Sequence, residues 1–150
     1  MSGVRCPVSD EICYSSVTVR VIVSGCLRRY VWEMSFKFEK LQVWQSALNL
    51  SDEIDVLTKR FPKSEIFILT SQIKRAADST TLNIAEGSTG QSNAEFKRFL
   101  SIAIRSNIEV VACLHLAKRR GIINPEDFSS LYGRCQELNG KLFALKKALN

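Results

Sequence analysis

An apolar heptad repeat near the C-terminus constrains this sequence more than any other feature. Between residues 128 and 149, apolar side chains recur at alternating intervals of three and four residues. Such intervals place side chains along one stripe of an α-helix, whereas a strand needs an interval of two. The segment therefore predicts an amphipathic helix whose buried stripe comprises Phe128, Leu131, Cys135, Leu138, Leu142, Leu145 and Leu149.

Two further helices are expected in the first half of the chain. One runs from about Phe38 to Arg60 and stops before Pro62, because a proline disfavours the helical conformation of the residue that precedes it. The other has Ser64 as its N-cap, and Gly87 as the left-handed residue that ends it.

The helices of the second half carry stronger boundary signals. Ser92 and Glu95 form a capping box at the start of the third helix, and Gly121 is expected to end it. Asn124 and Pro125 then supply the N-cap and first position of the fourth helix. Because all the loops are short, consecutive helices must pack antiparallel. Residues 34–150 are thus predicted to be an all-α, up-down-up-down four-helix bundle.

Residues 1–33 form a distinct N-terminal extension. Residues 15–23 alternate between polar and apolar, which is typical of a strand, but we recognise no second strand to pair with them. An isolated strand is unstable. Two interpretations follow: the extension is a misassigned start upstream of Met34, or it is a disordered arm.

Composition and cysteine spacing indicate a cytoplasmic protein. The net charge of +6 is mildly basic and permits an acidic partner without requiring one. No uninterrupted apolar run reaches the ~20 residues of a membrane span. The cysteines are odd in number, irregularly spaced and without a CxxC pair, so we expect free thiols in a reducing compartment at Cys6, Cys13, Cys26, Cys113 and Cys135.

No catalytic or metal-binding constellation can be assembled from the sequence. A diiron bundle needs Glu-x-x-His pairs, and Ala112 stands where the only histidine, His115, would need a glutamate. We also find no glycine-rich phosphate loop. We therefore expect no enzyme activity, no metal, no cofactor and no small-molecule substrate.

The second and third helices carry more apolar residues than one buried stripe requires. A helix that is apolar on two sides is usually buried on two sides. A wide core within one chain would explain this, but contiguous exposed apolar patches are rare on monomers. We therefore expect a homo-oligomer interface that includes Phe67, Ile68, Leu82, Ile104, Ile108 and Val111.

Basic residues gather in two places. One group lies in the middle of the second and third helices, and the other lies where the first and third helices end. The second group also complements the negative ends of helices, and either group can be a solvated face. The residues predicted to bind phosphates or an acidic partner are Lys74, Arg75, Lys97, Arg98, Arg105, Lys118, Arg119 and Arg120.

Several polar residues are expected to serve structure rather than chemistry. Asn83 and Asn107 lie on the buried stripes, where an amide needs partners and can specify register. Glu86 and Glu109 are expected to pair with Lys74 or Arg75.

Five short motifs together resemble one known family, the bacterial four-helix-bundle proteins encoded in intervening sequences of large-subunit ribosomal RNA genes. The resemblance covers about residue 36 to the C-terminus and makes Met34 a natural start. The motifs are FEKLQVWQ at 38–45, FP at 61–62, QIKRAA at 72–77, NIAEG at 83–87 and EFKRFL at 95–100.

The resemblance implies a homopentameric barrel of bundles. The family is also similar to the accessory variability determinant of diversity-generating retroelements, a basic pentamer that binds nucleic acid and reverse transcriptase. The positions that match are Lys74, Arg75, Asn83, Glu86, Gly87 and Glu109.

The sequence departs from the family pattern at Ile68, Asp78, Thr81 and Arg105. Small residues are expected at Ile68 and Arg105. Asp78 and Arg105 are therefore expected either to disturb tight packing or to form a salt bridge.

These observations favour a non-enzymatic oligomer that associates with ribosomal RNA or another nucleoprotein through its basic surface. The alternative is a protein-interaction adaptor, such as a reverse-transcriptase accessory protein, that makes no direct contact with nucleic acid. Salt-dependent binding to ribosomal RNA fragments would distinguish the two.

Overall fold

The computed structural model describes residues 17–23, 26–32, 36–90 and 92–149. The chain divides into two compact units, Met1–Ser35 and Phe36–Asn150. The side chains of the first unit lie outside the described part of the protein. Among them are the predicted thiols of Cys6, Cys13 and Cys26.

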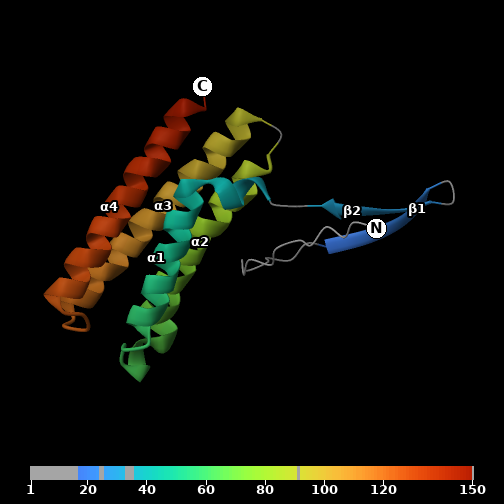
Figure 1. Ribbon diagram of the computed structural model, residues 1–150. Helices are drawn as coiled ribbons and strands as arrows, with labels where there is room; N and C mark the ends of the chain where they lie inside the picture. Colours follow the sequence, from blue (N-terminus) through green and yellow to red (C-terminus); the bar gives the residue numbers. More distant parts are fainter. Residues whose placement is uncertain (1–16, 24–25, 33–35, 91, 150) are drawn as a thin grey trace, which may run out of the picture. The chain divides into compact units, whose positions relative to one another are not determined.

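The first unit contains a β-hairpin. Strand β1 (Val17–Val23) pairs antiparallel with β2 (Cys26–Trp32), in a register that runs from Val17 opposite Trp32 to Val23 opposite Cys26 (Figure 1). The expectation that β1 has no partner was wrong. The second strand was missed because the consecutive arginines Arg28 and Arg29 interrupt its alternation of polar and apolar residues. The two residues between the strand segments, Ser24 and Gly25, were a sequence signal for a hairpin. The interpretations of residues 1–33 as a disordered arm or a misassigned start stay predictions.

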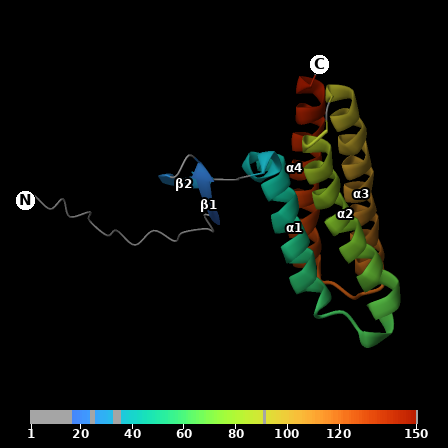
Figure 2. The ribbon, with the colours of Figure 1, turned by 90° about the vertical axis from the view of Figure 1, so that its right-hand side faces the viewer.

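The second unit is the predicted antiparallel four-helix bundle. Figures 1 and 2 show its long helices packed side by side, with successive helices running in opposite directions. The elements in chain order are a 3₁₀ helix η1 (Lys37–Lys40), α1 (Gln42–Thr58), a 3₁₀ turn η2 (Lys63–Glu65), a π-helical turn η3 (Ile66–Thr70), α2 (Ser71–Ser88), α3 (Asn93–Arg119) and α4 (Pro125–Ala148).

The core follows the predicted stripes. Each of the four α-helices contributes fully buried aliphatic side chains, among them Ile54 of α1, Ile73 of α2, Leu114 of α3 and Leu142 of α4. Among the described helices only α3 is long and apolar enough to cross a membrane, and 44% of its apolar window is buried inside the bundle.

Three helix boundaries confirm the sequence analysis. Ser92 Oγ accepts a hydrogen bond from the Glu95 amide at 3.2 Å, and Asn124 Oδ1 accepts one from the Asp127 amide at 2.7 Å. Gly121 follows α3 with a φ of 67°, the left-handed conformation that glycine adopts without strain.

The start of the second helical segment differs from the prediction. Ser64 is not an N-cap but lies inside η2, and α2 itself begins at Ser71. The chain already turns at Pro62, whose carbonyl accepts a hydrogen bond from the Glu65 amide at 2.9 Å. The first helix also begins later than predicted, because Leu41 adopts an extended conformation between η1 and α1.

Gly87 does not end α2 in a left-handed conformation, as the sequence had suggested. The helix continues through it, and Gly87 is buried against α3. A Cβ atom at this position would lie 2.6 Å from Phe99 Cβ and 2.7 Å from Phe96 Cδ2. Gly87 is therefore a point of close approach between two helices.

The two asparagines expected on the buried stripes differ in their contacts. Asn107 is 1% exposed, and its Nδ2 donates to the Cys135 carbonyl at 2.9 Å, which joins α3 to α4. Asn83 is half-buried and donates to the Ser79 carbonyl one turn earlier at 2.7 Å.

Candidate interaction surfaces

One outer face of the bundle is built by α2 and α3 together. Gln72 Nε2 donates to Glu109 Oε1, and the hydroxyls of Ser79 and Ser106 are 3.0 Å apart, so these contacts set the register of the two helices. Exposed apolar and basic side chains of α2, α3 and the adjoining turn η3 lie on the outside of the bundle. We call this surface the α2–α3 face and define it by Ile68, Arg75, Leu82, Arg98, Arg105 and Ile108.

The apolar side chains of this face are strongly exposed. Ile68 is 60% exposed, Leu82 65% and Ile108 56%, and the neighbouring Phe67 is 92% exposed. These four predicted interface residues therefore have surface available for a partner.

One of the predicted interface residues, Ile104, was assigned wrongly, and a second, Val111, is partly covered by its own chain. Ile104 is only 6% exposed and belongs to the core, and Val111 is half-buried against that core. Both lie on the same stripe of α3 as Asn107, which faces α4, so they are covered within one chain.

Two of the predicted phosphate-binding residues are held by carboxylates. Lys74 pairs with Asp55 of α1, and Arg120 pairs with Glu65 at 3.0 Å. The expected pairing of Lys74 with Glu86 or Glu109 is therefore wrong. The two lysines around Asp55, Lys74 first and then Lys59, lower the pKa of this carboxyl to about 2.

Four of the predicted basic residues are exposed arginines. Within the described residues, no ion pair engages Arg75, Arg98, Arg105 or Arg119. The Arg98 guanidinium lies 6.0 Å from the centre of the Phe99 ring. Lys97, by contrast, is half-buried.

Asp78 and Arg105, two of the residues that depart from the family pattern, form no salt bridge among the described side chains. Asp78 accepts a hydrogen bond from Ser51 of α1 at 2.5 Å instead of pairing with Arg105. Thr81 is buried, and its hydroxyl donates to the Ala77 carbonyl at 3.4 Å.

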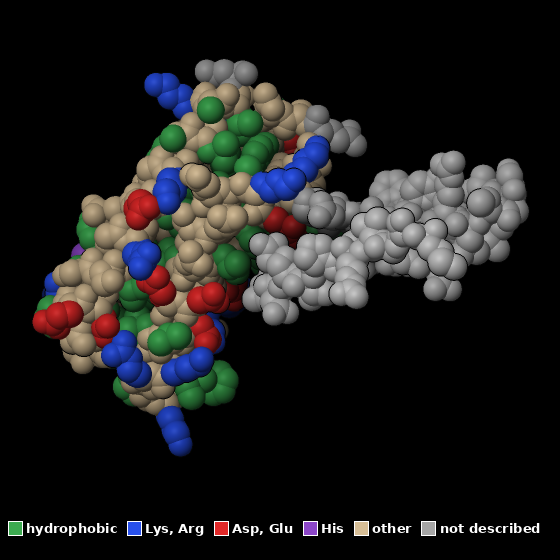
Figure 3. Space-filling model, in the orientation of Figure 1, with side chains coloured by type: hydrophobic (Ala, Val, Ile, Leu, Met, Phe, Trp, Pro, Cys, Tyr) green, Lys and Arg blue, Asp and Glu red, His purple; other side chains and the backbone are tan. Residues whose placement is uncertain are grey.

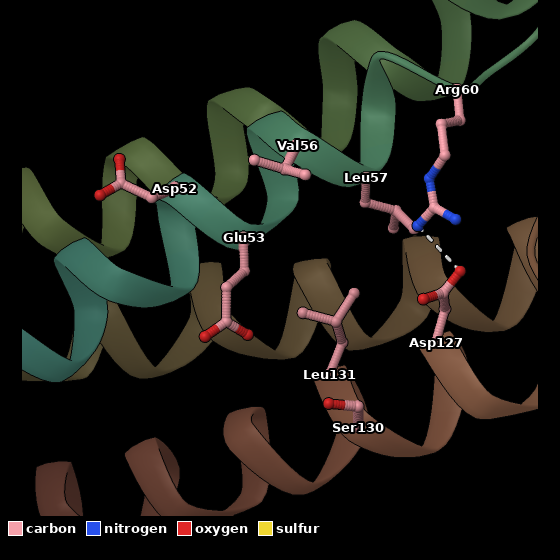
Figure 4. Close-up of a pocket in the computed structure, with 8 residues that line it drawn as sticks. All are labelled: Asp52, Glu53, Val56, Leu57, Arg60, Asp127, Ser130 and Leu131. Atoms are coloured by element: carbon pink, nitrogen blue, oxygen red, sulfur yellow. Dashed lines mark hydrogen bonds and ion pairs between the residues drawn. The ribbon is translucent and has the colours of Figure 1, made fainter.

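A groove lies between α1 and α4. Figure 4 shows it closed at one end by the ion pair of Arg60 with Asp127, whose atoms are 2.8 Å apart. Its volume is about 310 Å³. The lining residues are Asp52, Glu53, Val56, Leu57, Arg60, Asp127, Ser130 and Leu131. They include no histidine or cysteine that could activate Ser130 or hold a metal.

The opposite charges on this side of the bundle are interspersed. Figure 3 shows acidic and basic side chains next to one another where α1 and α4 come to the front. Ion pairs account for part of the pattern, since Glu53 contacts Arg134 at 3.1 Å and Glu137 contacts Lys141 at 2.6 Å. On this side of the bundle, charges of both signs therefore lie close together.

The described cysteines are buried free thiols, as expected. Cys113 and Cys135 lie in the core, and burial raises the pKa of Cys135 to about 12. Groups of three or more metal-ligating side chains were not found in the described part of the chain.

An aromatic cluster at the seam of α3 and α4 was missed at the sequence level. His115 is exposed and packs edge-on against Phe128, with ring centres 4.9 Å apart. Tyr132 stacks on Phe128 at 5.6 Å. The four-residue spacing of Phe128 and Tyr132 could have predicted that these two rings lie side by side on one helix. Their contact with His115 could not be predicted, because it depends on how α3 packs against α4.

These features define a class of protein: an antiparallel four-helix bundle with a mixed apolar and basic outer face. Comparison identifies the family, because the model of the 23S rRNA-intervening sequence protein family matches residues 39–144. The chain belongs to this family.

A solved structure supports the same assignment. The chain is similar to a protein of unknown function from the S23 ribosomal protein family of Bacteroides thetaiotaomicron, with a TM-score of 0.66 and 29% identity. The match covers 70% of this chain and 98% of that one. A search among curated proteins found no significant match.

Proposed function

We propose that this protein is a non-enzymatic, cytoplasmic oligomer that associates with ribosomal RNA or another nucleoprotein through its basic surface. The observation that carries the proposal is the composition of the α2–α3 face. It combines exposed Leu82 and Ile108 with Arg75, Arg98 and Arg105, which form no ion pair within the described part of the protein.

The apolar residues of this face support self-association. Leucine and isoleucine side chains exposed by more than half on a folded surface gain free energy when a second copy covers them. The resemblance of the sequence to the family favours a pentamer. In a cyclic oligomer the arginines of each copy would recur around the ring, which multiplies the positive charge available to phosphates.

The arginines support contact with nucleic acid. A guanidinium that is not held by a carboxylate can bind phosphate oxygens through two parallel hydrogen bonds. Each such contact releases counterions from the nucleic acid, so binding must weaken as salt rises.

Replacing Ile108 by Glu is expected to convert the oligomer to monomers. A carboxylate at this position would have to lose its hydration when a second copy covers the face. Size-exclusion chromatography with light scattering measures the change. Val56→Glu is the matched control, because Val56 is 61% exposed but lies on α1.

An unchanged mass for Ile108→Glu, with helicity preserved in circular dichroism, would contradict assembly through this face. Loss of assembly in both variants would indicate a general effect of added charge. The assembly proposal requires that only the Ile108 variant dissociates.

The triple variant Arg75→Gln, Arg98→Gln, Arg105→Gln is expected to bind ribosomal RNA fragments more weakly and with less dependence on salt. Removing one guanidinium that binds a phosphate should lower the slope of log K against log salt by about 0.7 to 0.9. Fluorescence anisotropy across a salt series measures both effects. The control Lys40→Gln, Lys63→Gln, Lys147→Gln removes the same charge from exposed positions outside the α2–α3 face.

A specific observation also favours the adaptor alternative. The turn η3 exposes three consecutive apolar residues: Ile66 by 44%, Phe67 by 92% and Ile68 by 60%. Such a tip suits a protein partner. If the chain oligomerises but binds no RNA even at low salt, the adaptor function replaces the proposed one.

A further inference from the structure

An aromatic cluster joins α3 and α4. We call His115, Phe128 and Tyr132 the aromatic platform. The rings of Phe128 and Tyr132 are stacked, with an interplanar angle of 18° and centres 5.6 Å apart. The His115 ring stands nearly perpendicular to both, at 67° to Phe128 and 81° to Tyr132.

The three rings differ in how much surface they leave free. Phe128 is only 8% exposed and forms the buried base of the platform. Tyr132 is half-buried, and His115 is exposed. Two perpendicular rings of intermediate or high exposure thus form a corner, in which a flat molecule can stack on one ring and place its edge against the other.

Positive charge borders this corner. The Lys118 ammonium lies 4.1 Å from the centre of the Phe128 ring, within the range of a cation–π contact. Arg119 follows at the end of α3 and is exposed. The carboxylate of Asp127, the residue before Phe128, forms an ion pair with Arg60 at 2.8 Å.

We propose that the aromatic platform holds an unpaired base of single-stranded RNA, while Lys118 and Arg119 contact the adjacent phosphates. The proposal rests on the proposed association with RNA and specifies which form of RNA is bound. Aromatic side chains beside a basic surface are the usual means of binding single strands, because every base has a face that can stack. The bases of a duplex are already stacked on one another and cannot enter the corner.

The test compares a single strand with a duplex. Anisotropy of a fluorescein-labelled 12-nucleotide oligouridylate and of a 12-base-pair RNA duplex is measured with the full chain and with His115→Ala, Tyr132→Leu. Loss of the stacking surface is expected to weaken binding of the single strand by about fivefold to a hundredfold. Binding of the duplex, which uses phosphate contacts alone, should change less than twofold.

Two further variants make the test specific. Phe143→Leu removes an aromatic ring from α4 that is 52% exposed and outside the platform, so its affinity for oligouridylate should equal that of the unmodified chain. Tyr132→Phe keeps the ring and should retain binding. Thermal melting followed by circular dichroism verifies that each variant is folded.

The outcomes separate this inference from the proposed function. If the double variant binds oligouridylate as tightly as the unmodified chain, the platform does not hold a base, whereas the function stands as long as RNA is bound. Equal weakening of single strand and duplex also overturns the inference. If neither RNA binds to the unmodified chain, both the inference and the proposed function fail.

Discussion

Replacing Leu138 by Ala is expected to lower the free energy of unfolding by about 2–5 kcal/mol. Leu138 is 1% exposed and lies in the middle of the heptad stripe of α4. Removal of its outer atoms leaves a cavity that the surrounding helices cannot fill by small shifts, because each is held by its own buried stripe. Chemical denaturation followed by circular dichroism at 222 nm measures the change.

A control for this prediction is Leu116→Ala. Leu116 is 45% exposed on α3, so its loss should cost less than about 1 kcal/mol. A cost near zero for Leu138→Ala would mean that α4 packs in a different rotation from the one described, and the other buried residues of its stripe would then be wrong as well.

Replacing Gly87 by Ala is expected to destabilise the bundle by about 1–3 kcal/mol, although alanine is the better helix former. The added methyl would lie 2.6 Å from Phe99 Cβ. That atom is bonded directly to the backbone, so it can retreat only if α3 moves. The steric cost therefore exceeds the gain of about 0.5–1 kcal/mol that alanine normally brings to a helix.

Two other glycines provide a matched control. Gly133 and Gly140 also lie inside a helix, but a Cβ atom at either position meets nothing within 4 Å. Alanine at these positions should stabilise the protein by about 0.5–1 kcal/mol. Stabilisation at all three positions would show that α2 and α3 are farther apart at Gly87 than the structure indicates.

The two outcomes together bear on how the α2–α3 face is presented. The close approach at Gly87 and the Gln72–Glu109 and Ser79–Ser106 contacts set the spacing and register of α2 and α3. Leu82 and Arg75 lie on one of these helices, and Arg105 and Ile108 lie on the other. A change in helix spacing would separate these residues, so Gly87→Ala is expected to weaken assembly before it unfolds the chain.

Local sequence was sufficient for the elements whose ends are controlled by single residues. Ser92, Asn124 and Gly121 act on backbone groups within three or four residues of themselves, so their roles follow from position alone. The buried stripe of α4 was equally predictable, because helical periodicity brings Leu131, Leu138 and Leu142 to one side whatever they pack against. The four-helix architecture and the family resemblance follow from the same information.

Other features depended on contacts between segments distant in the sequence, and only the tertiary structure decided them. Gly87 carries the sequence signal of a helix end, but the approach of Phe99 gives it a different role. Ile104 and Ile108 look equally apolar, yet the rotation of α3 against α4 buries the first and exposes the second. Lys74 forms an ion pair with Asp55 of α1. His115 contacts Tyr132 only because α3 and α4 lie side by side. Periodicity determines which residues share a stripe, but the neighbouring helix determines what that stripe contacts.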